Sequence, residues 1–268
     1  MPPEMLAWLC EFCYIDLPCA LVRRLARGPF PLREACDAFL QTPPCEELSA
    51  FAQQALRALR ETRLLVLHYV NRNADTGFVG YSFLAPDESV TLALRGSESG
   101  PCAPSLVDWA DNFAAPFAGS VQYQDIYRLV NRYPAGPFTI TGHSKGGHNA
   151  LYALAVARNP QARAVAFNGQ GFRRDQLDRA QKARLRAQAI NYVTRSDIVG
   201  ALLYHPETRE FCAARLDENA HALSAFLFQP DGYPVPAGRT CASRAIEAAS
   251  RIALHGLRSL QSSATING

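Results

Sequence analysis

The stretch Gly142-His143-Ser144-Lys145-Gly146 decides how the rest of this chain is interpreted. A short apolar run, residues 137–141, precedes it, and a helix-like run over residues 148–157 follows it. The serine therefore lies on a turn between an expected strand and an expected helix. A turn this tight brings the flanking residues against their neighbours, so that only glycine fits at positions 142 and 146.

A serine between two glycines, at the junction of a strand and a helix, is typical of the nucleophile elbow of α/β-hydrolases. The turn lifts the Ser144 hydroxyl out of the sheet. It also places this hydroxyl at a helix N-terminus, where backbone N–H groups stabilise developing negative charge. The five-residue pattern alone also occurs in ordinary glycine-rich loops, so the proposed nucleophile has to be supported by partners elsewhere in the chain.

The composition is that of an ordinary globular protein and excludes several other classes. The 268 residues suit one large domain or two small ones, with 48% hydrophobic and 19% charged residues. The net charge of +3 and the lack of a Lys/Arg block give no indication of nucleic-acid binding. The apolar run at residues 5–10 is short and has acidic neighbours, which is unlike a signal peptide, and no stretch is long enough to span a membrane. We therefore expect a cytoplasmic protein without a transmembrane segment.

The eight cysteines are expected to be reduced thiols, because no export signal accompanies them. Cys10 and Cys13 have the C-x-x-C spacing of metal ligands, but no second pair with that spacing follows. At positions i and i+3 of an amphipathic helix they are better interpreted as buried core residues. The sequence predicts no metal site and no cofactor.

The order of expected elements predicts an α/β fold with a mostly parallel central sheet, an antiparallel N-terminal hairpin and helices on both faces. Residues 1–60 form short helices that pack on a catalytic core at 61–235, all within a single domain, and a C-terminal helix covers 240–262. Branched and alternating apolar residues predict strands at 63–70, 77–84 and 89–94, of which the first two form the hairpin. The pattern then alternates: helix 120–132, strand 138–141, helix 144–158, strand 163–167, helix 174–187, strand 189–194, and a last helix at 243–260.

A serine nucleophile needs a base and a carboxylate, and in this fold they follow it in the order Asp, then His. Asp197 lies just beyond the strand at 189–194, where open α/β sheets carry their sites. Its alternative interpretation is a turn or helix-cap residue. Asp217, Glu218 and Asp231 also follow the serine, but no strong strand precedes them.

Three histidines follow Asp197, and His221 is the preferred base. It lies in a polar loop before an apolar run, from which it can reach over the serine. His205 is the alternative, whereas His255 falls inside the expected last helix. His143 adjoins the serine, but a neighbour in an extended strand points the other way.

The oxyanion of a tetrahedral intermediate needs two donors. One is expected to be the backbone N–H of Lys145, the residue after the nucleophile. The other is expected from the segment Arg95-Gly96-Ser97, which ends a strand, through the N–H or hydroxyl of Ser97. The alternative interpretation of this segment is an ordinary Gly-Ser turn.

Several segments together resemble class 3 (fungal-type) lipases. They are residues 94–97 (Leu-Arg-Gly-Ser), 108–111 (Asp-Trp-Ala-Asp), 142–146, 197–199 and His221. The lysine in the elbow and the N-terminal helices are more similar to a bacterial branch of the superfamily, the Mbeg1-like proteins. The resemblance extends over about residues 60 to 230.

This resemblance implies a serine ester hydrolase with Ser144 as nucleophile, Asp197 as orienting acid, His221 as base and Ser97 as oxyanion residue. It also implies that Asp108 and Trp109 support the oxyanion loop; alternatively they are a helix cap and a core aromatic. A lid would fall at residues 98–107, which contain only two large apolar residues. The expected substrate is therefore a monomeric acyl ester or a phospholipid-derived ester, not emulsified fat.

Two other functions remain open at this stage. A binding or scaffold module can retain the same fold without turnover. An acyltransferase would use the same three residues with an acceptor other than water. The sequence leaves the acyl chain length, the head group and the oligomeric state undetermined.

Overall fold

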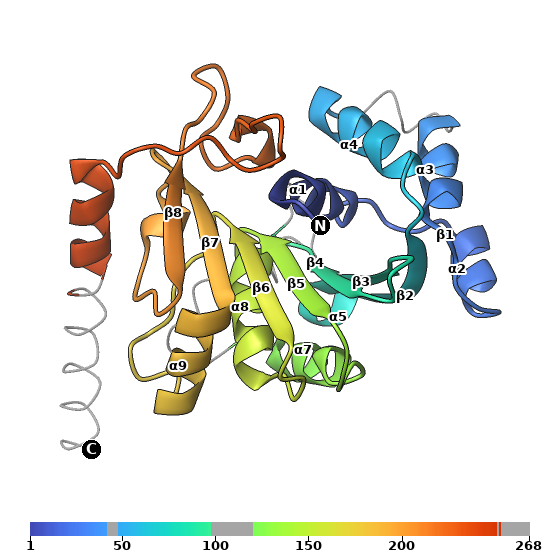
Figure 1. Ribbon diagram of the computed structural model, residues 1–268, viewed down its shortest axis with the longest axis horizontal. Helices are drawn as coiled ribbons and strands as arrows, with labels where there is room; N and C mark the ends of the chain where they lie inside the picture. Colours follow the sequence, from blue (N-terminus) through green and yellow to red (C-terminus); the bar gives the residue numbers. More distant parts are fainter. Residues whose placement is uncertain (42–47, 98–119, 251, 253–268) are drawn as a thin grey trace.

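The protein is built around one mixed sheet (Figure 1). The computed structural model describes residues 1–41, 48–97, 120–250 and 252. Within these residues the sheet has eight strands that lie side by side in chain order. Their bounds are β1 Phe30–Pro31, β2 Leu65–Arg72, β3 Phe78–Leu84, β4 Val90–Leu94, β5 Phe138–His143, β6 Ala162–Phe167, β7 Ala189–Thr194 and β8 Thr208–Cys212.

The pairing of neighbouring strands changes once across the sheet, from antiparallel to parallel. β1 to β4 pair antiparallel, and β2 and β3 form the expected hairpin. From β4 to β8 every neighbouring pair is parallel. This is the α/β-hydrolase arrangement that the sequence predicts, with its parallel part downstream of the hairpin.

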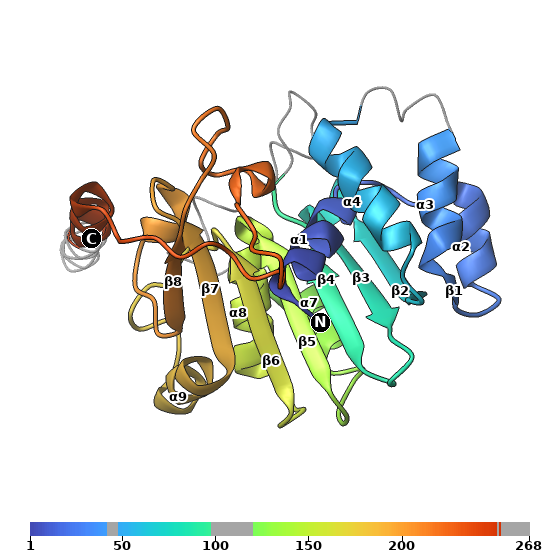
Figure 2. The same ribbon diagram turned by 45° about the horizontal axis from the view of Figure 1, so that its top comes forward.

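Helices cover both faces of the sheet (Figure 2). Strands that follow one another in space as in the chain need right-handed crossovers, which place all the connecting helices on one face. α7, α8 and α9 lie there, and the N-terminal helices cover the opposite face (Figures 1 and 2). The bounds are α1 Pro3–Phe12, α2 Cys19–Leu25, α3 Leu32–Gln41, α4 Ala50–Arg60, α5 Asn73–Thr76, α7 Tyr123–Val130, α8 Lys145–Val156 and α9 Arg179–Gln188, with 3₁₀ turns η2 Val199–Ala201 and η3 Leu223–Ala225.

Each face has its own apolar core, because successive strand residues point to opposite sides. On β3, Phe78 belongs to the core under α7 and α8, whereas Val79, Tyr81 and Phe83 belong to the core under α1, α3 and α4. α1 contacts β4, β5 and β6, so the N-terminal segment covers the middle of the parallel sheet. That residues 1–60 and the core fold as one domain stays a prediction.

Cys10 and Cys13 lie in the core on α1, both fully buried. The Cys10 thiol is 3.3 Å from the Thr141 hydroxyl on β5. Burial raises the pKa of Cys10 to about 12, so this sulfur stays a neutral thiol. The six cysteines that the structure describes are free thiols.

Some boundaries differ from the sequence-based expectation. The short strands β1 and β8 were not expected. α9 begins at Arg179 instead of residue 174, because Asp178 caps it and forms a reciprocal capping box with Gln181. The last helix is described only over residues 241–250, so its expected continuation to residue 260 lies outside the described residues.

Among the described residues, no helix combines the length and the apolar character that crossing a bilayer requires.

Replacing Phe12 by alanine tests whether the N-terminal block and the sheet unfold together. The Phe12 ring lies 5.7 Å from Phe39, 5.2 Å from Tyr81 and 5.8 Å from Phe83, centroid to centroid. We expect Phe12→Ala to lower the free energy of unfolding by about 3–5 kcal/mol, the usual cost of truncating a buried aromatic. Urea unfolding, monitored by circular dichroism, measures this change in the free energy of unfolding.

The control is Val22→Ala on α2, where the side chain is 40% exposed and little should change. In a Trp109→Phe background, Trp8 on α1 is the single tryptophan, and its fluorescence reports on the N-terminal block alone. Coincident fluorescence and dichroism transitions are expected. A separate early fluorescence transition would show that residues 1–60 form their own unit.

Candidate active site

The elbow backbone holds Ser144 in a conformation that L-residues rarely adopt. Its φ is 58° and its ψ is −123°, between the last residue of β5 and the first of α8. Such a conformation costs about 1–3 kcal/mol and persists only where the surroundings impose it. Here the Ser144 N–H donates to the Phe167 carbonyl at 3.0 Å, and its carbonyl accepts from the His148 N–H at 3.1 Å.

Both glycines of the elbow are required by close backbone contacts. A Cβ at position 142 would overlap the carbonyl group of Gly146. A Cβ at position 146 would overlap the carbonyl oxygen of Leu94 at the end of β4. No rearrangement of a flexible side chain relieves either overlap, because the opposing atoms belong to the backbone.

Ser144, His221 and Asp197 form one hydrogen-bonded chain. Ser144 Oγ is 2.8 Å from His221 Nε2, and His221 Nδ1 is 2.8 Å from Asp197 Oδ1. The carboxylate can only accept, so Nδ1 carries the proton. In neutral His221 the other nitrogen then accepts from the serine O–H, which is the tautomer that a general base needs.

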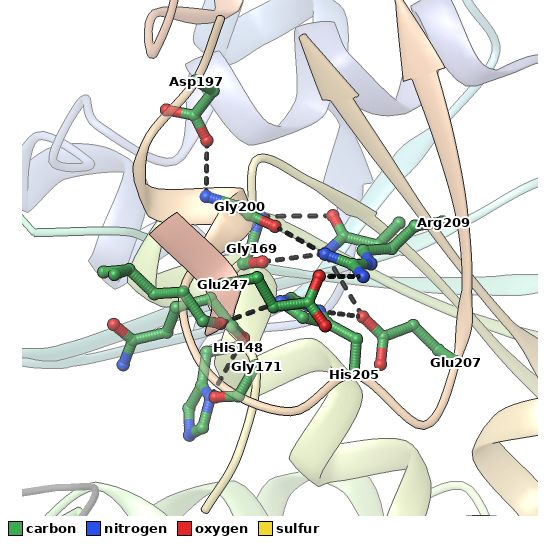
Figure 3. Close-up of polar contacts among 12 residues, drawn as sticks. His148, Gly169, Gly171, Asp197, Gly200, His205, Glu207, Arg209 and Glu247 are labelled. Carbon is green, nitrogen blue, oxygen red and sulfur yellow. Dashed lines mark hydrogen bonds and ion pairs between the residues drawn. The ribbon is translucent and has the colours of Figure 1, made fainter. Parts of the chain in front are cut away.

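Asp197 is held in place by the turn that follows β7. Its side chain is 1% exposed, and its oxygens accept from the Gly200 N–H at 2.5 Å and the Val199 N–H at 3.3 Å. Figure 3 shows the carboxylate pointing to Gly200. The expected catalytic carboxylate is therefore also a turn cap, which combines the two interpretations that the sequence left open.

The backbone around His221 is held by hydrogen bonds from the ends of three neighbouring strands. The His143 Nε2–H donates to the His221 carbonyl at 2.6 Å, and the Asn168 amide donates to the same oxygen at 3.0 Å. The Thr194 hydroxyl donates to the preceding carbonyl, that of Ala220. His143 ends β5, Asn168 follows β6 and Thr194 ends β7. Together they fix where the imidazole stands.

Asn168 links two of these supports. Its φ of 48° lies in the left-handed region, which asparagine tolerates better than most residues. Its side-chain oxygen accepts from the Thr194 N–H at 2.9 Å, while its NH₂ group holds the His221 loop. The sequence did not reveal Asn168, Thr194 or the role of His143, although the end of each parallel strand is where such residues are found.

His143 is a neutral group next to the base. Burial lowers its pKa to about 3, and the neighbouring His221 acts in the same direction. The two rings are 4.9 Å apart. A neutral neighbour does not repel the positive charge that an imidazole base acquires when it takes a proton.

The segment 95–97 passes beside the nucleophile. A Cβ on Gly96 would lie 3.4 Å from Ser144 Cβ and would overlap the His143 carbonyl. Ser97 follows at once, and Lys145 begins α8. Gly96, the residue before Ser97, thus lies beside Ser144, and the function of Ser97 and Lys145 as oxyanion donors stays a prediction. The expected supports Asp108 and Trp109, and the lid at 98–107, fall outside the described residues.

The alternative histidines and carboxylates have other partners. Both ring nitrogens of His205 are bonded, Nδ1 to Glu207 at 2.7 Å and Nε2 to the Leu202 carbonyl at 2.8 Å. His255 lies outside the described residues. Glu218 accepts from Ser224, Asp231 accepts from the Tyr233 N–H, and Asp217 is exposed. Across the ranges described, no three His, Cys, Asp or Glu side chains converge as metal ligands would.

His205 and Glu207 form a buried pair behind the Asp197 turn (Figure 3). Both side chains are fully buried, and Asn191 donates to the same carboxylate at 3.3 Å. Burial acts to raise the pKa of Glu207, but the His205 imidazole and the hydrogen bonds outweigh it, so that this pKa lies below its ordinary value. Because His205 Nε2 donates to Leu202 just after η2, the pair braces the turn that carries Asp197.

Comparison with known proteins identifies a family. The family model described as Mbeg1-like matches residues 56–249. No curated protein matches the chain.

Three similar solved structures are lipases by description. One, described as fungal lipases, is 15% identical, with 82% of this chain and 88% of that chain covered and a TM-score of 0.45. The mono- and diacylglycerol lipase from Aspergillus oryzae is 12% identical over 69% of this chain and 75% of that chain, with a TM-score of 0.45. The lipase from Rhizopus microsporus var. chinensis is 15% identical over 76% and 77%, with a TM-score of 0.39.

Replacing Gly146 by alanine tests the close packing of the elbow. The new methyl group would press on the Leu94 carbonyl, so we expect a loss of about 1–3 kcal/mol or more in the free energy of unfolding. Chemical denaturation measures the loss. Gly238→Ala is the matched control, because a Cβ there meets nothing within 4 Å. Equal stability of the two variants would contradict the contact.

Replacing Glu207 by glutamine tests the buried pair. The folded-state pKa of Glu207 is depressed, so its contribution to stability is present above its unfolded pKa and is lost as pH falls through the folded value. At neutral pH, Glu207→Gln leaves His205 without its carboxylate and should cost about 3 kcal/mol or more.

Melting temperatures recorded between about pH 3 and about pH 7 measure both effects. The difference between wild type and Glu207→Gln should shrink toward the acid end. Glu218→Gln, on the loop before His221, serves as control and should leave the pH dependence of melting unchanged. A constant difference at every pH would argue against an ionised Glu207.

Proposed function

The chain belongs to the Mbeg1-like family, and from that premise and the geometry of its elbow we propose that it is a serine ester hydrolase acting on carboxylic acyl esters. The observation that carries the proposal is the unbroken chain of hydrogen bonds Ser144–His221–Asp197. Ser144, Asp197 and His221 lie beyond the ends of β5, β7 and β8, in the parallel part of the sheet. A hydroxyl, an imidazole acceptor and a buried carboxylate in this order are the parts that nucleophilic acyl transfer requires.

In the acylation step, His221 Nε2 takes the proton of Ser144 Oγ as that oxygen attacks the ester carbonyl carbon. The Asp197 carboxylate accepts from Nδ1–H and stabilises the imidazolium that forms. The tetrahedral intermediate collapses when Nε2–H protonates the alcohol leaving group. An acyl group is then esterified to Ser144.

Deacylation repeats these steps with water. His221 takes a proton from the water molecule as its oxygen attacks the acyl carbon, and then returns the proton to Ser144 Oγ. In both steps the oxyanion accepts hydrogen bonds from the N–H of Lys145 and from Ser97. The mechanism uses no metal and no organic cofactor.

The substrate class follows from the sequence around the site. The segment 98–107 has few large apolar residues for an interfacial lid. We therefore propose a monomeric acyl ester or a phospholipid-derived ester as substrate. In acyl transfer, the same residues would deliver the acyl group to an acceptor other than water.

Hydrolysis of p-nitrophenyl esters of graded chain length tests the proposal. Ser144→Ala should lower kcat by about 10³-fold or more, and Asp197→Asn by a similar factor because it removes the acceptor that selects the His221 tautomer. Ser224→Ala, a serine that bonds Glu218 instead of His221, is the matched control and should keep wild-type activity. Equal turnover by wild type and Ser144→Ala would exclude the mechanism.

A fluorophosphonate probe separates an enzyme from a binding module. Wild-type protein should be labelled at Ser144, as located by peptide mapping. Folded protein that stays unlabelled would favour a binding module. Product analysis with an added alcohol separates hydrolysis from acyl transfer, since a transferase gives the new ester in place of the free acid.

A further inference from the structure

The loop after α1 reaches the active site from outside the part of the chain that the family model matches. Tyr14 Oη lies 3.1 Å from His143 Nδ1, at the end of β5. Two residues later, Asp16 Oδ1 lies 3.1 Å from Arg95 Nη1, just beyond β4, and that Arg95 side chain is 1% exposed. The N-terminal segment thus contacts the end of β5, where the elbow begins, and the end of the neighbouring strand β4.

The direction of the Tyr14 hydrogen bond follows from the partners of His143. Its Nε2 is 2.6 Å from the His221 carbonyl, which can only accept, so Nε2 carries the proton. Burial lowers the pKa of His143 to about 3, so the ring is neutral and Nδ1 has a lone pair. Burial raises the pKa of Tyr14, so the hydroxyl keeps its proton and donates a hydrogen bond to Nδ1.

We propose that Tyr14 is a positioning residue of the active site, whose hydroxyl fixes the orientation of the His143 ring that holds the His221 carbonyl. This rests on the proposed function insofar as His221 is the base that activates Ser144. The reacting atoms do not touch Tyr14. It acts on them through His143 and the His221 backbone.

The physical basis is the hydrogen bond that holds the Nδ1 edge of the buried His143 ring. Without the Tyr14 hydroxyl, Nδ1 loses this donor, and the ring can turn so that Nε2–H no longer points at the His221 carbonyl. The hold on that oxygen by His143 then weakens, while the Asn168 amide still donates to it. The imidazole of His221 drifts from a serine oxygen that it must contact within about 3 Å for proton transfer.

The same hydroxyl also packs against the expected oxyanion segment. A Cβ on Gly96 would overlap Tyr14 Oη as well as the His143 carbonyl. Tyr14 therefore sits between the two strand ends, in contact with the residue before Ser97 and with the residue before Ser144. A segment outside the matched family range thereby completes the support of both halves of the site.

Tyr14→Phe tests the proposal by removing one oxygen atom. We expect kcat for p-nitrophenyl butyrate to fall about tenfold with an unchanged KM, the effect of losing one buried hydrogen bond that positions the base. The matched control is Tyr81→Phe, because the Tyr81 hydroxyl anchors the same segment through the Ile15 carbonyl at 2.6 Å and has no bond to His143. If anchoring alone mattered, both variants would lose activity equally.

A second readout does not depend on turnover. Nitrogen-15 spectra of histidine-labelled protein report which ring nitrogen of each of the six histidines is protonated. The His143 signals, assigned by their loss in His143→Gln, should show the Nε2–H form in wild type and in Tyr81→Phe. In Tyr14→Phe, Nε2 should stay protonated, whereas the Nδ1 signal should move downfield because this nitrogen has lost its hydrogen-bond donor.

The outcomes separate this proposal from the hydrolase itself. An unchanged Nδ1 signal in Tyr14→Phe, or a loss of kcat no larger than in Tyr81→Phe, would overturn the role of Tyr14 while leaving an active wild type a hydrolase. If wild type neither hydrolyses esters nor reacts with a fluorophosphonate, the hydrolase fails. The nitrogen-15 spectra then decide on the Tyr14–His143 link alone.

Discussion

The structure around the site depends on two backbone carbonyls, those of Ala220 and His221, being held at the carboxyl edge of the sheet. Parallel pairing of β5, β6 and β7 makes this possible. The register sets His143 beside Phe167, and Phe167 beside Tyr192, so that Asn168 and Thr194 lie one and two residues beyond this row. Because neighbouring strands are about 5 Å apart, one short loop can accept hydrogen bonds from all three.

The second constraint is the order of the strands. A sheet whose spatial order equals its chain order receives all its crossover helices on one face, so the other face needs a cover from elsewhere. α1 supplies it over β4, β5 and β6. The loop that leaves α1 then emerges where β4 and β5 end, which is why Tyr14 and Asp16 meet His143 and Arg95. The packing of α1 on β4, β5 and β6 therefore both covers the core and brings the supporting loop to the site.

The sequence predicted those parts of the site that depend on local rules. The elbow follows from the glycines at 142 and 146, and Asp197 and His221 follow from strand ends and chain order; the structure brings these side chains together, while their catalytic roles stay proposals. β8 was missed because its TREFC sequence is short and rich in charge, and its strand conformation comes from pairing with β7. Tyr14 was missed for a related reason. Its partner is 129 positions away, and no periodicity in sequence encodes a contact of that range.

What separates a hydrolase from a binding module in this fold is the support of His221, not the elbow itself. The bonds that hold the strained Ser144 backbone use its N–H and carbonyl and do not involve Oγ, which contacts the His221 imidazole. A binding module would keep the elbow for the sake of packing, since the atoms nearest to a Cβ at position 142 or 146 belong to the backbone. It would have no comparable need to hold the His221 carbonyl from two strand ends and its Nδ1 by a carboxylate that is itself capped by two N–H groups. Ordering this loop costs conformational entropy, and the ordered loop presents an imidazole acceptor to a hydroxyl, which is the arrangement that acyl transfer uses.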